Sequence, residues 1–332
     1  MAQNVSYATT DTILESLVLH ILPYIGDEGD GILNTNGLTA ALNAKGAKEV
    51  IDGGLEVWFG LDYSENSNFK FQGKNDDMTA NAQDPQVRLR FDWKAFTGSV
   101  VINDLDKAMN KGRAAIKQWA KTLRRQATKT IANQFNSAWW KATPGANDPQ
   151  SIPSLIPITY NAGTVGGLSR AGNAYLQNGY YSTAISDIGS ESGISKIEEL
   201  KIRYSVGTSL ADLLIVDQTR FGNMAGYLST LYRFRPDDKL RVLKIPSIMI
   251  GDATMIFENT NVLGGANSIT AGYMYGINTD YLWIKTLRDG NSVWSTEFER
   301  IGQKLNKAVF FKWFGNLVTN CPRAHWVASS LT

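Results

Sequence analysis

Hydrophobic and polar residues alternate strictly in two stretches of the chain, GLEVWFGLDY and VRLRFDWK. The apolar positions are Leu55, Val57, Phe59, Leu61 and Tyr63 in the first, and Val87, Leu89, Phe91 and Trp93 in the second. A period of two over such lengths predicts half-buried strands. The residues between them are polar and rich in turn formers, so residues 53–95 are predicted to form a long β-hairpin with a wide tip.

A hairpin of this length would be unusual inside a compact monomer. We therefore expect it to project and to lie on another subunit. The residues expected to make this inter-subunit contact are Trp58, Phe59, Tyr63, Phe69, Lys70, Phe71 and Lys74.

A helical period follows the hairpin. Apolar residues recur mostly at three- and four-residue steps, at Met109, Ile116, Trp119, Leu123, Ala127, Ile131, Phe135 and Ala138. This spacing predicts one amphipathic helix from about Asp106 to Lys141, roughly 50 Å long at ~1.5 Å per residue. Pro144 and Gly145 would end it.

The pattern changes again between residues 150 and 290. Two helical segments, SGISKIEELKIRYSVG and QTRFGNMAGYLSTLY, alternate with the strand-like runs ADLLIVD, SIMIGD, TMIFEN and DYLWIK. Such alternation is typical of a compact α/β module. The aromatic tail after residue 290 is expected to pair with the strands that precede the long helix, which makes the module an insertion into a domain built from both ends of the chain.

The first 50 residues are the least regular. Thr12 and Glu15 form a capping box that opens a short apolar helix, which Pro23 ends. A Gly- and Asn-rich segment follows. We interpret residues 1–52 as an arm that needs a partner surface to become ordered.

Composition describes a folded protein. The 332 residues are 43% hydrophobic and 19% charged. Cys321 is the only cysteine, which excludes an intrachain disulfide and suits a reducing compartment. The chain does not open with a signal-peptide pattern, and its most apolar early run is too short to span a bilayer. These features favour a soluble, intracellular protein.

The charge is segregated. The formal net charge is +2, but residues 107–147 hold nine bases and no acid, which leaves 24 bases against all 31 acids elsewhere, a net of −7. The bases on the predicted helix form a ridge at steps of four residues, with one neighbour beside it: Arg113, Lys117, Lys121, Arg125 and Lys129, and Arg124. Exposed helices usually interleave both signs. The ridge therefore favours a polyanion such as nucleic acid, contacted through phosphates. An acidic protein partner and a solvated surface remain the alternatives.

No pattern in the sequence predicts catalysis, a metal site or a cofactor. The two histidines, His20 and His325, are far apart and lie in apolar segments. With one cysteine they cannot form a zinc cluster. The FQGKND segment lacks the spacing of a phosphate-binding loop, and TVGGLSRAG lacks that of a dinucleotide site. The acidic turn at 26–31 does not match a calcium-binding loop. We expect a protein that is not an enzyme.

The order of these parts resembles that of the major capsid proteins of tailed bacteriophages, which have the Hong-Kong-97-type fold. The segment VRLRFDWKAFTGSVVINDLDKAMNKG looks like the run of that family from an aromatic strand into its spine helix, and TVGGLSRAGNAYLQ is similar to the stretch that opens its axial domain. GYMYGINTDYLWIK and GNLVTNCPRAHWVASSL are similar to its closing strands.

The resemblance implies an α+β fold with five parts. They are an N-terminal arm (1–52), an extended β-hairpin loop (53–95), the first part of the peripheral domain with the spine helix (96–149), an inserted α/β axial domain (150–290) and the return strands of the peripheral domain (291–332).

The resemblance also implies a function. Many copies would form the hexamers and pentamers of an icosahedral phage head around double-stranded DNA, assembled in the host cytoplasm. The ridge would then face the packaged DNA. Separate scaffolding, portal and cement proteins are possible partners, and no membrane is involved.

Two other functions remain open at this stage. An encapsulin-like shell that stores an enzyme would have the same fold, but its interior would have little reason to be so basic. A free nucleic-acid-binding protein would stay small and bind with a steep dependence on salt.

Overall fold

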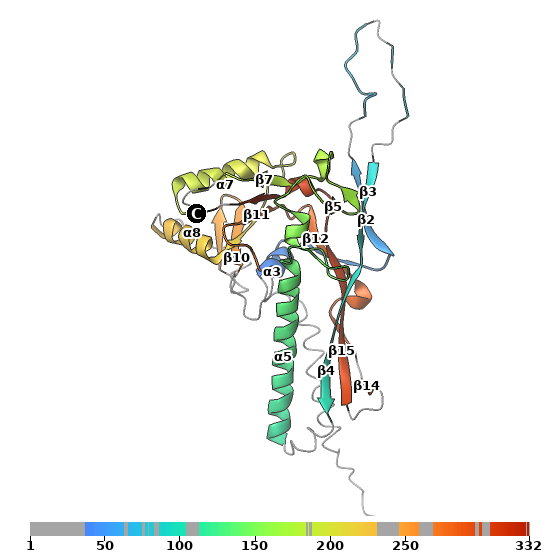
Figure 1. The fold of residues 1–332 in the computed structure, drawn as a ribbon, viewed down its shortest axis with the longest axis vertical. Coiled ribbons are helices and arrows are strands. Elements are labelled where there is room, and N and C mark those ends of the chain that lie inside the picture. Colours follow the sequence, from blue (N-terminus) through green and yellow to red (C-terminus); the bar gives the residue numbers. More distant parts are fainter. Residues whose placement is uncertain are drawn as a thin grey trace, which may run out of the picture.

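The structure, a computed structural model of the chain, describes residues 37–62, 66–74, 77–78, 80–82, 86–103, 113–183, 185, 188–230, 246–258, 268–295, 299–300, 306–329 and 331. The predicted first helix with His20, the acidic turn at 26–31 and Tyr63 lie outside these residues. Figure 1 shows two sheets with their helices in a central body, a hairpin that projects from one end and a long helix at the other.

The first sheet has six strands around one long central strand. They are β1 (Lys48–Ile51), β4 (Lys94–Asn103), β12 (Leu282–Leu287), β13 (Val293–Trp294), β14 (Glu299–Arg300) and β15 (Asn306–Thr319). β4 pairs antiparallel along one edge of β15, from Asn103 opposite Asn306 to Lys94 opposite Gly315. β12, β13 and β14 pair antiparallel along the other edge, and β1 adds to β12 in parallel. The prediction that the tail returns to the strand before the long helix is confirmed.

The second sheet also has six strands, in the order β7-β16-β11-β8-β10-β9. Their bounds are β7 (Gly179–Tyr181), β8 (Leu213–Asp217), β9 (Ser247–Ile250), β10 (Ala253–Glu258), β11 (Met274–Ile277) and β16 (Trp326–Ala328). β8 pairs parallel with β10 and β7 pairs parallel with β16, whereas the remaining pairs are antiparallel.

Every residue of β8 is buried, because helices cover both faces of this sheet. Leu214 and Val216 pack with α7 (Glu191–Arg203) and α8 (Gln218–Thr230) on one face. Leu213 and Ile215 point to the other face, into the cluster that contains α3 (Gly37–Ala44) and the end of α5 (Arg113–Trp139). The period-two alternation of a strand thus divides the core into two clusters.

The long helix α5 packs against the first sheet through the stripe that its sequence predicts. Ile131 and Phe135 are buried, and Trp119, Leu123 and Ala127 are partly buried against the same cluster. Phe135 touches Trp313 of β15 at 4.9 Å between ring centroids. The helix ends at Trp139, two residues before the predicted end, and residues 104–112 lie outside the description.

The hairpin strands are β2 (Glu56–Asp62) and β3 (Gln86–Asp92), paired antiparallel from Glu56 opposite Asp92 to Asp62 opposite Gln86. β3 continues almost directly into β4, so one extended run links the hairpin to the edge of the first sheet. The remaining short elements are α6 (Ile152–Leu155), β5 (Thr164–Val165), β6 (Leu168–Ser169), η1 (Ala174–Leu176), η2 (Arg288–Gly290) and η3 (Pro322–Ala324).

Three placements differ from the sequence expectations. Residues 37–51 were expected to need a partner surface, yet α3 is buried in the core of its own chain and β1 joins the first sheet. β12 was assigned to the inserted module but pairs with β15. β16 was assigned to the returning tail but pairs with β7 and β11 of the second sheet. β12 and β16 form where strands were expected and differ only in their partners, whereas α3 and β1 were not predicted.

Candidate interaction surfaces

The root of the hairpin is packed against its own chain. Val57, Leu61, Leu89 and Phe91 are buried, in accordance with the alternating pattern. Phe59, which was expected to contact a neighbour, instead stacks on Trp283 of β12 at 5.7 Å, and the Lys285 ammonium lies 4.8 Å from the Phe59 ring centroid. Leu55 precedes the strand and is 99% exposed, so its predicted place on the buried face is wrong.

A glycine turn holds the hairpin from the side. The Arg90 amide of β3 donates a 3.0 Å hydrogen bond to the carbonyl of Gly166, in the turn between β5 and β6. Gly166 has φ +55°, and a Cβ placed there would lie 2.9 Å from the Leu89 side chain. Only glycine combines this backbone conformation with so close an approach. The glycine-rich TVGGLSRAG segment therefore has a structural role at the hairpin root.

The tip of the hairpin is apolar and exposed. Phe69 is 85% exposed, Met78 is 87% exposed and Phe71 is fully exposed. Asn68 ties the two sides together, because its side chain donates to the Asn81 carbonyl at 2.7 Å and accepts from the Asn81 amide at 3.2 Å. A gathering of large apolar side chains at the end of a projection is typical of an interaction site.

Charged residues accompany these apolar residues. Lys70, Lys74 and Asp77 of the tip are all exposed. Trp58, on the outer face of β2, is 57% exposed, and the Arg88 guanidinium lies 5.0 Å from its ring centroid. Apart from Phe59, the described members of the predicted inter-subunit set are therefore available to a partner.

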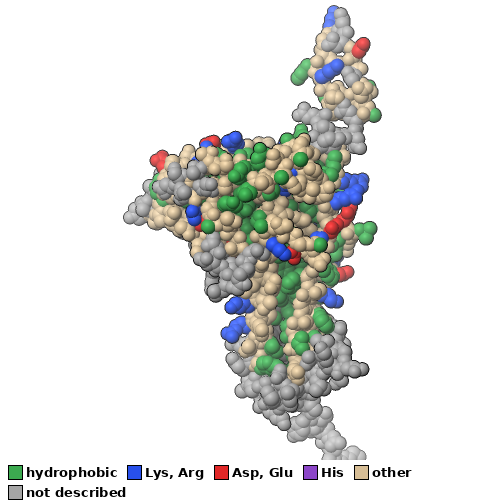
Figure 2. Space-filling model, in the orientation of Figure 1, with side chains coloured by type: hydrophobic (Ala, Val, Ile, Leu, Met, Phe, Trp, Pro, Cys, Tyr) green, Lys and Arg blue, Asp and Glu red, His purple; other side chains and the backbone are tan. Residues whose placement is uncertain are grey.

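Two residues of the predicted basic ridge, Arg125 and Lys129, can be placed on α5, on the side away from the sheet. Arg125 and Lys129 are exposed, and neither forms an ion pair within the part of the chain that the structure describes. Arg113, Lys117, Lys121 and Arg124 belong to the same helix, but their side chains lie outside the description. Figure 2 shows basic side chains on the edge of α5 that faces away from β4 and β15.

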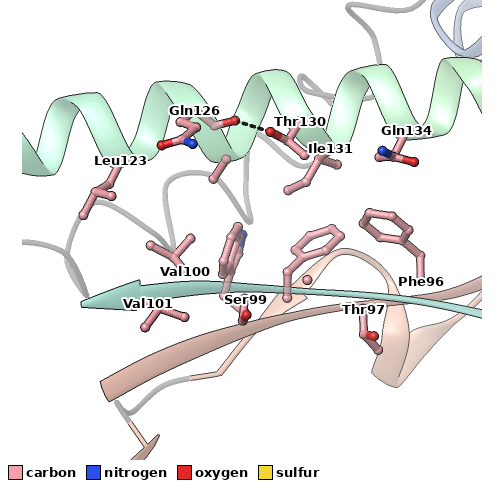
Figure 3. Close-up of a pocket in the computed structure, with 14 residues that line it drawn as sticks. Phe96, Thr97, Ser99, Val100, Val101, Leu123, Gln126, Thr130, Ile131 and Gln134 are labelled. Atoms are coloured by element: carbon pink, nitrogen blue, oxygen red, sulfur yellow. Dashed lines mark hydrogen bonds between the residues drawn. The ribbon is translucent and has the colours of Figure 1, made fainter. Parts of the chain in front are cut away.

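An open groove of about 580 Å³ runs between α5 and the edge of β4. Leu123, Gln126, Thr130 and Ile131 line it from the helix, and Phe96 and Val100 point toward them from the strand (Figure 3). The Thr130 hydroxyl donates to the carbonyl of Gln126 at 2.8 Å. The lining has no ionisable side chain, so the groove offers packing surface without acid–base chemistry.

A buried arginine organises the junction between the two sheets. Arg170 is 1% exposed, and its guanidinium donates to the carbonyls of Leu155 at 2.7 Å and Leu176 at 3.0 Å, and to Asn178 Oδ1 at 3.1 Å. Burial lowers the Arg170 pKa to about 10, so it stays charged at neutral pH. The Ser154 carbonyl, at 3.4 Å, is a fourth and more distant acceptor. These four oxygen atoms take the place of a carboxylate partner.

His325 lies at the same junction and is completely buried. Its Nδ1 accepts from the Asn278 amide at 3.2 Å, and its Nε2 meets the Thr319 hydroxyl at 3.0 Å. Burial lowers the His325 pKa to about 3. This histidine is a packed, neutral residue, as its aromatic setting predicted, and it joins the end of β15 to the end of β11.

Within the described ranges the structure holds no group of three or more His, Cys, Asp or Glu residues that could bind a metal ion. Among the same residues, no helix is both long enough and apolar enough to cross a membrane.

The fold resembles phage capsid structures over most of the chain. The structure of the cyanophage A-1(L) capsid asymmetric unit matches with a TM-score of 0.60 and 10% identity, covering 86% of this chain and 91% of that one. The capsid of Myoviridae phage XM1 matches with a TM-score of 0.52 and 12% identity, covering 86% and 90%. The capsid of the native GTA particle matches with a TM-score of 0.52 and 11% identity, covering 88% and 90%.

No protein-family model matches the sequence, and neither does any curated protein. At 10–12% identity the structural likeness defines the fold. The chain therefore has a fold seen in phage capsid structures. The particular fold is the one found in capsids of phage particles, and the predicted resemblance to it is confirmed.

Proposed function

We propose that this chain is a major capsid protein that self-assembles into the hexamers and pentamers of an icosahedral phage head enclosing double-stranded DNA. The fold carries the proposal, and the exposed hairpin tip supports it. The chain has a phage capsid fold along nearly nine-tenths of its length, and its hairpin ends in exposed Phe69 and Phe71. Large apolar side chains at the end of a projection need a partner surface.

In this assembly the hairpin is the extended loop that lies across a neighbouring subunit. α5 is the spine helix, the sheet around β15 is the core of the peripheral domain, and the sheet around β8 is the core of the axial domain. Separate scaffolding, portal and cement proteins would join the particle without a membrane.

The proposed inner surface is the basic side of α5. Arg125 and Lys129 stand opposite the stripe that packs on the first sheet, so these two cations turn outward from their own subunit. Cations without acids nearby are suited to contact with phosphates. Such contacts do not depend on the base sequence of the DNA. This gives the segregated charge of the sequence a physical reason.

The proposal is tested by the size of the particles that the purified protein forms. Sedimentation velocity at low and high salt, with negative-stain imaging of any fast fraction, should reveal ring-shaped capsomers or closed shells. A particle of 36.6 kDa, unchanged by salt, protein concentration or added scaffolding protein, would contradict the proposal. Closed shells that package protein and never nucleic acid would favour an encapsulin-like cargo shell instead.

A further inference from the structure

A pocket of about 360 Å³ lies where η1, β7, η3 and the C-terminal end of α7 meet. Three tyrosines and two arginines dominate its lining: Tyr160, Tyr180, Tyr204, Arg203 and Arg323. Tyrosine and arginine are the residues most enriched, with tryptophan, at the energetic centres of protein interfaces. The pocket is built from distant segments of the chain, and no sequence motif indicates it.

The aromatic side of this pocket is held in place before any partner arrives. The rings of Tyr160 and Tyr180 are stacked at 6.2 Å, and the Tyr204 hydroxyl donates to the Tyr180 carbonyl at 2.8 Å. Tyr204 lies directly on Gly179, where an added Cβ would be 2.5 Å from its ring. Side chains ordered in advance lose little entropy on binding, which favours affinity.

The two arginines have no carboxylate partner among the described residues. The Arg203 guanidinium lies 5.7 Å from the Tyr204 ring centroid, and that of Arg323 lies 5.3 Å from the Tyr175 ring centroid. Both side chains are exposed. Other arginines of the chain do pair with acids, as Arg220 pairs with Asp217 and Arg288 with Asp52. Guanidinium groups that lie beside aromatic rings and lack a carboxylate partner suit a ligand that brings a carboxylate and an apolar side chain together.

The hairpin tip of this chain offers a carboxylate and apolar side chains, together with the exposed Lys70 and Lys74. Asp77 is exposed beside Met78, and Phe69 and Phe71 lie across the tip from them. We propose that the Tyr160–Arg203–Arg323 pocket receives the hairpin tip of a second copy of this chain. Asp77 then pairs with the arginines, and an apolar residue of the tip packs on the tyrosines. The inference rests on the proposed function and names the receiving surface of the hairpin.

The contact must form between copies. The tip stands away from the body of its own subunit (Figure 1), whereas the pocket lies among elements of that body. Tip and pocket are different surfaces, so each copy gives one and receives one. Head-to-tail contacts of this kind close into rings when the rotation between copies closes.

Photo-cross-linking tests the position of the tip. Phe71 is replaced by p-benzoylphenylalanine in the full chain, assembled particles are purified and irradiated, and cross-linked peptides are identified by mass spectrometry. Mixed light and heavy isotope labels report contacts between copies. We expect peptides that contain Tyr160, Tyr180, Tyr204 or Arg323, joined between copies. The same probe at Leu55, exposed at the hairpin root, should not label them.

The outcomes separate the inference from the function it rests on. Particles that form but whose tips label only other surfaces, or an accessory protein, overturn the inference and leave the proposed function standing. If the chain forms no particles, both the inference and the proposed function are overturned.

Charge reversal tests the pairing. Asp77→Lys alone, and Arg203→Glu with Arg323→Glu, should each lower the yield of particles by about tenfold or more, since each juxtaposes like charges. Combining the three substitutions should restore most of the yield. Unchanged unfolding temperatures would show that the subunits still fold. A combined variant no better than its parents would contradict the pairing.

Discussion

The backbone amide of Arg90 and the carbonyl of Gly166 are joined by a hydrogen bond of 3.0 Å, which ties the projecting hairpin to a turn 76 positions later in the chain. The bond requires Gly166 to lie against Leu89, which is fully buried. The base of the hairpin is thus part of the folded core, while its tip extends away. Because the base is fixed in the core, the hairpin can project from the subunit in a defined direction.

Replacing Gly166 should loosen this attachment. Gly166→Ala adds a Cβ at 2.9 Å from Leu89 and forces an L-residue into a positive φ, so we expect a loss of about 2–4 kcal/mol in the free energy of unfolding. Amide exchange in β2 and β3 should rise. Gly172→Ala is the matched control, because Gly172 has φ +73° with open space around it, and only the backbone cost of ~1 kcal/mol should remain. Equal losses in the two variants would exclude a packing role for Gly166.

Arg170 should be among the most sensitive side chains in the chain. Arg170→Met leaves the carbonyls of Leu155 and Leu176 and the amide oxygen of Asn178 buried without a donor, and we expect a loss of about 3–5 kcal/mol. Urea denaturation measures it. Arg288→Met removes a surface ion pair with Asp52, in which both side chains are at least 70% exposed, and should cost about 0–1 kcal/mol. Similar costs for both would contradict the buried role of Arg170.

His325 should make stability depend on pH in a defined window. Its folded pKa of about 3 lies below the unfolded value of 6.5, so the unfolded state binds more protons between these values. The contribution of His325 is therefore complete above pH 6.5 and is lost as the pH falls toward 3, with a slope of up to about 1.4 kcal/mol per pH unit.

Comparison with His325→Gln isolates this effect between pH 6.5 and pH 5. The carboxyls whose pKa the structure lowers, Asp148 beside Lys141 and Asp252 beside Lys201, titrate below that window. Urea denaturation should show a flatter pH dependence for the variant than for the parent chain. If the free energies of unfolding of the two proteins changed in parallel with pH, protonation of His325 would not destabilise the folded state, and the account would be contradicted.

The sequence predicts local structure here better than it predicts partners. Alternation in β2 and β3 and the stripe from Trp119 to Phe135 depend on neighbours within a few residues, and both elements form as predicted. The partners of β12 and β16 depend on which edges meet after 18 to 230 residues of intervening chain. Neither strand carries a residue pattern that specifies its sheet.

The interaction surfaces were predictable to different degrees. The i+4 spacing of Arg125 and Lys129 opposite Ala127 and Ile131 is sufficient to predict that they are exposed. The pocket around Tyr204 was not predictable, because Tyr160, Arg203 and Arg323 meet only through the junction of the two sheets. Phe59 was predicted to contact a neighbour, since nothing in its strand indicates that Trp283 lies beneath it.

The ridge on α5 should determine how DNA binding depends on salt. Arg125→Gln with Lys129→Gln removes two cations, and the slope of log K against log salt for double-stranded DNA should become shallower by about 2. Fluorescence anisotropy on purified capsomers measures it. Lys70→Gln with Lys74→Gln removes two exposed cations from the hairpin tip and should leave the slope unchanged. Equal changes in the two double variants would exclude a specific role for the ridge.

Assembly should require the apolar tip. Phe69→Ser with Phe71→Ser removes two exposed rings that make no packing contribution to the subunit, so the unfolding temperature should stay the same while particles fall by about tenfold or more. Val293→Ser, at an exposed position on β13, is the control and should assemble normally. Normal assembly of the double tip variant would show that the hairpin is dispensable.

The central claim is that copies of this chain build a shell through their projecting hairpins. Electron cryo-microscopy of the purified assemblies tests it most directly. We expect closed particles made of five- and six-membered rings, in which each hairpin lies on the adjacent subunit and α5 lines the interior. Subunits that stay monomeric under every assembly condition, or particles in which the hairpins touch no neighbour, would contradict it.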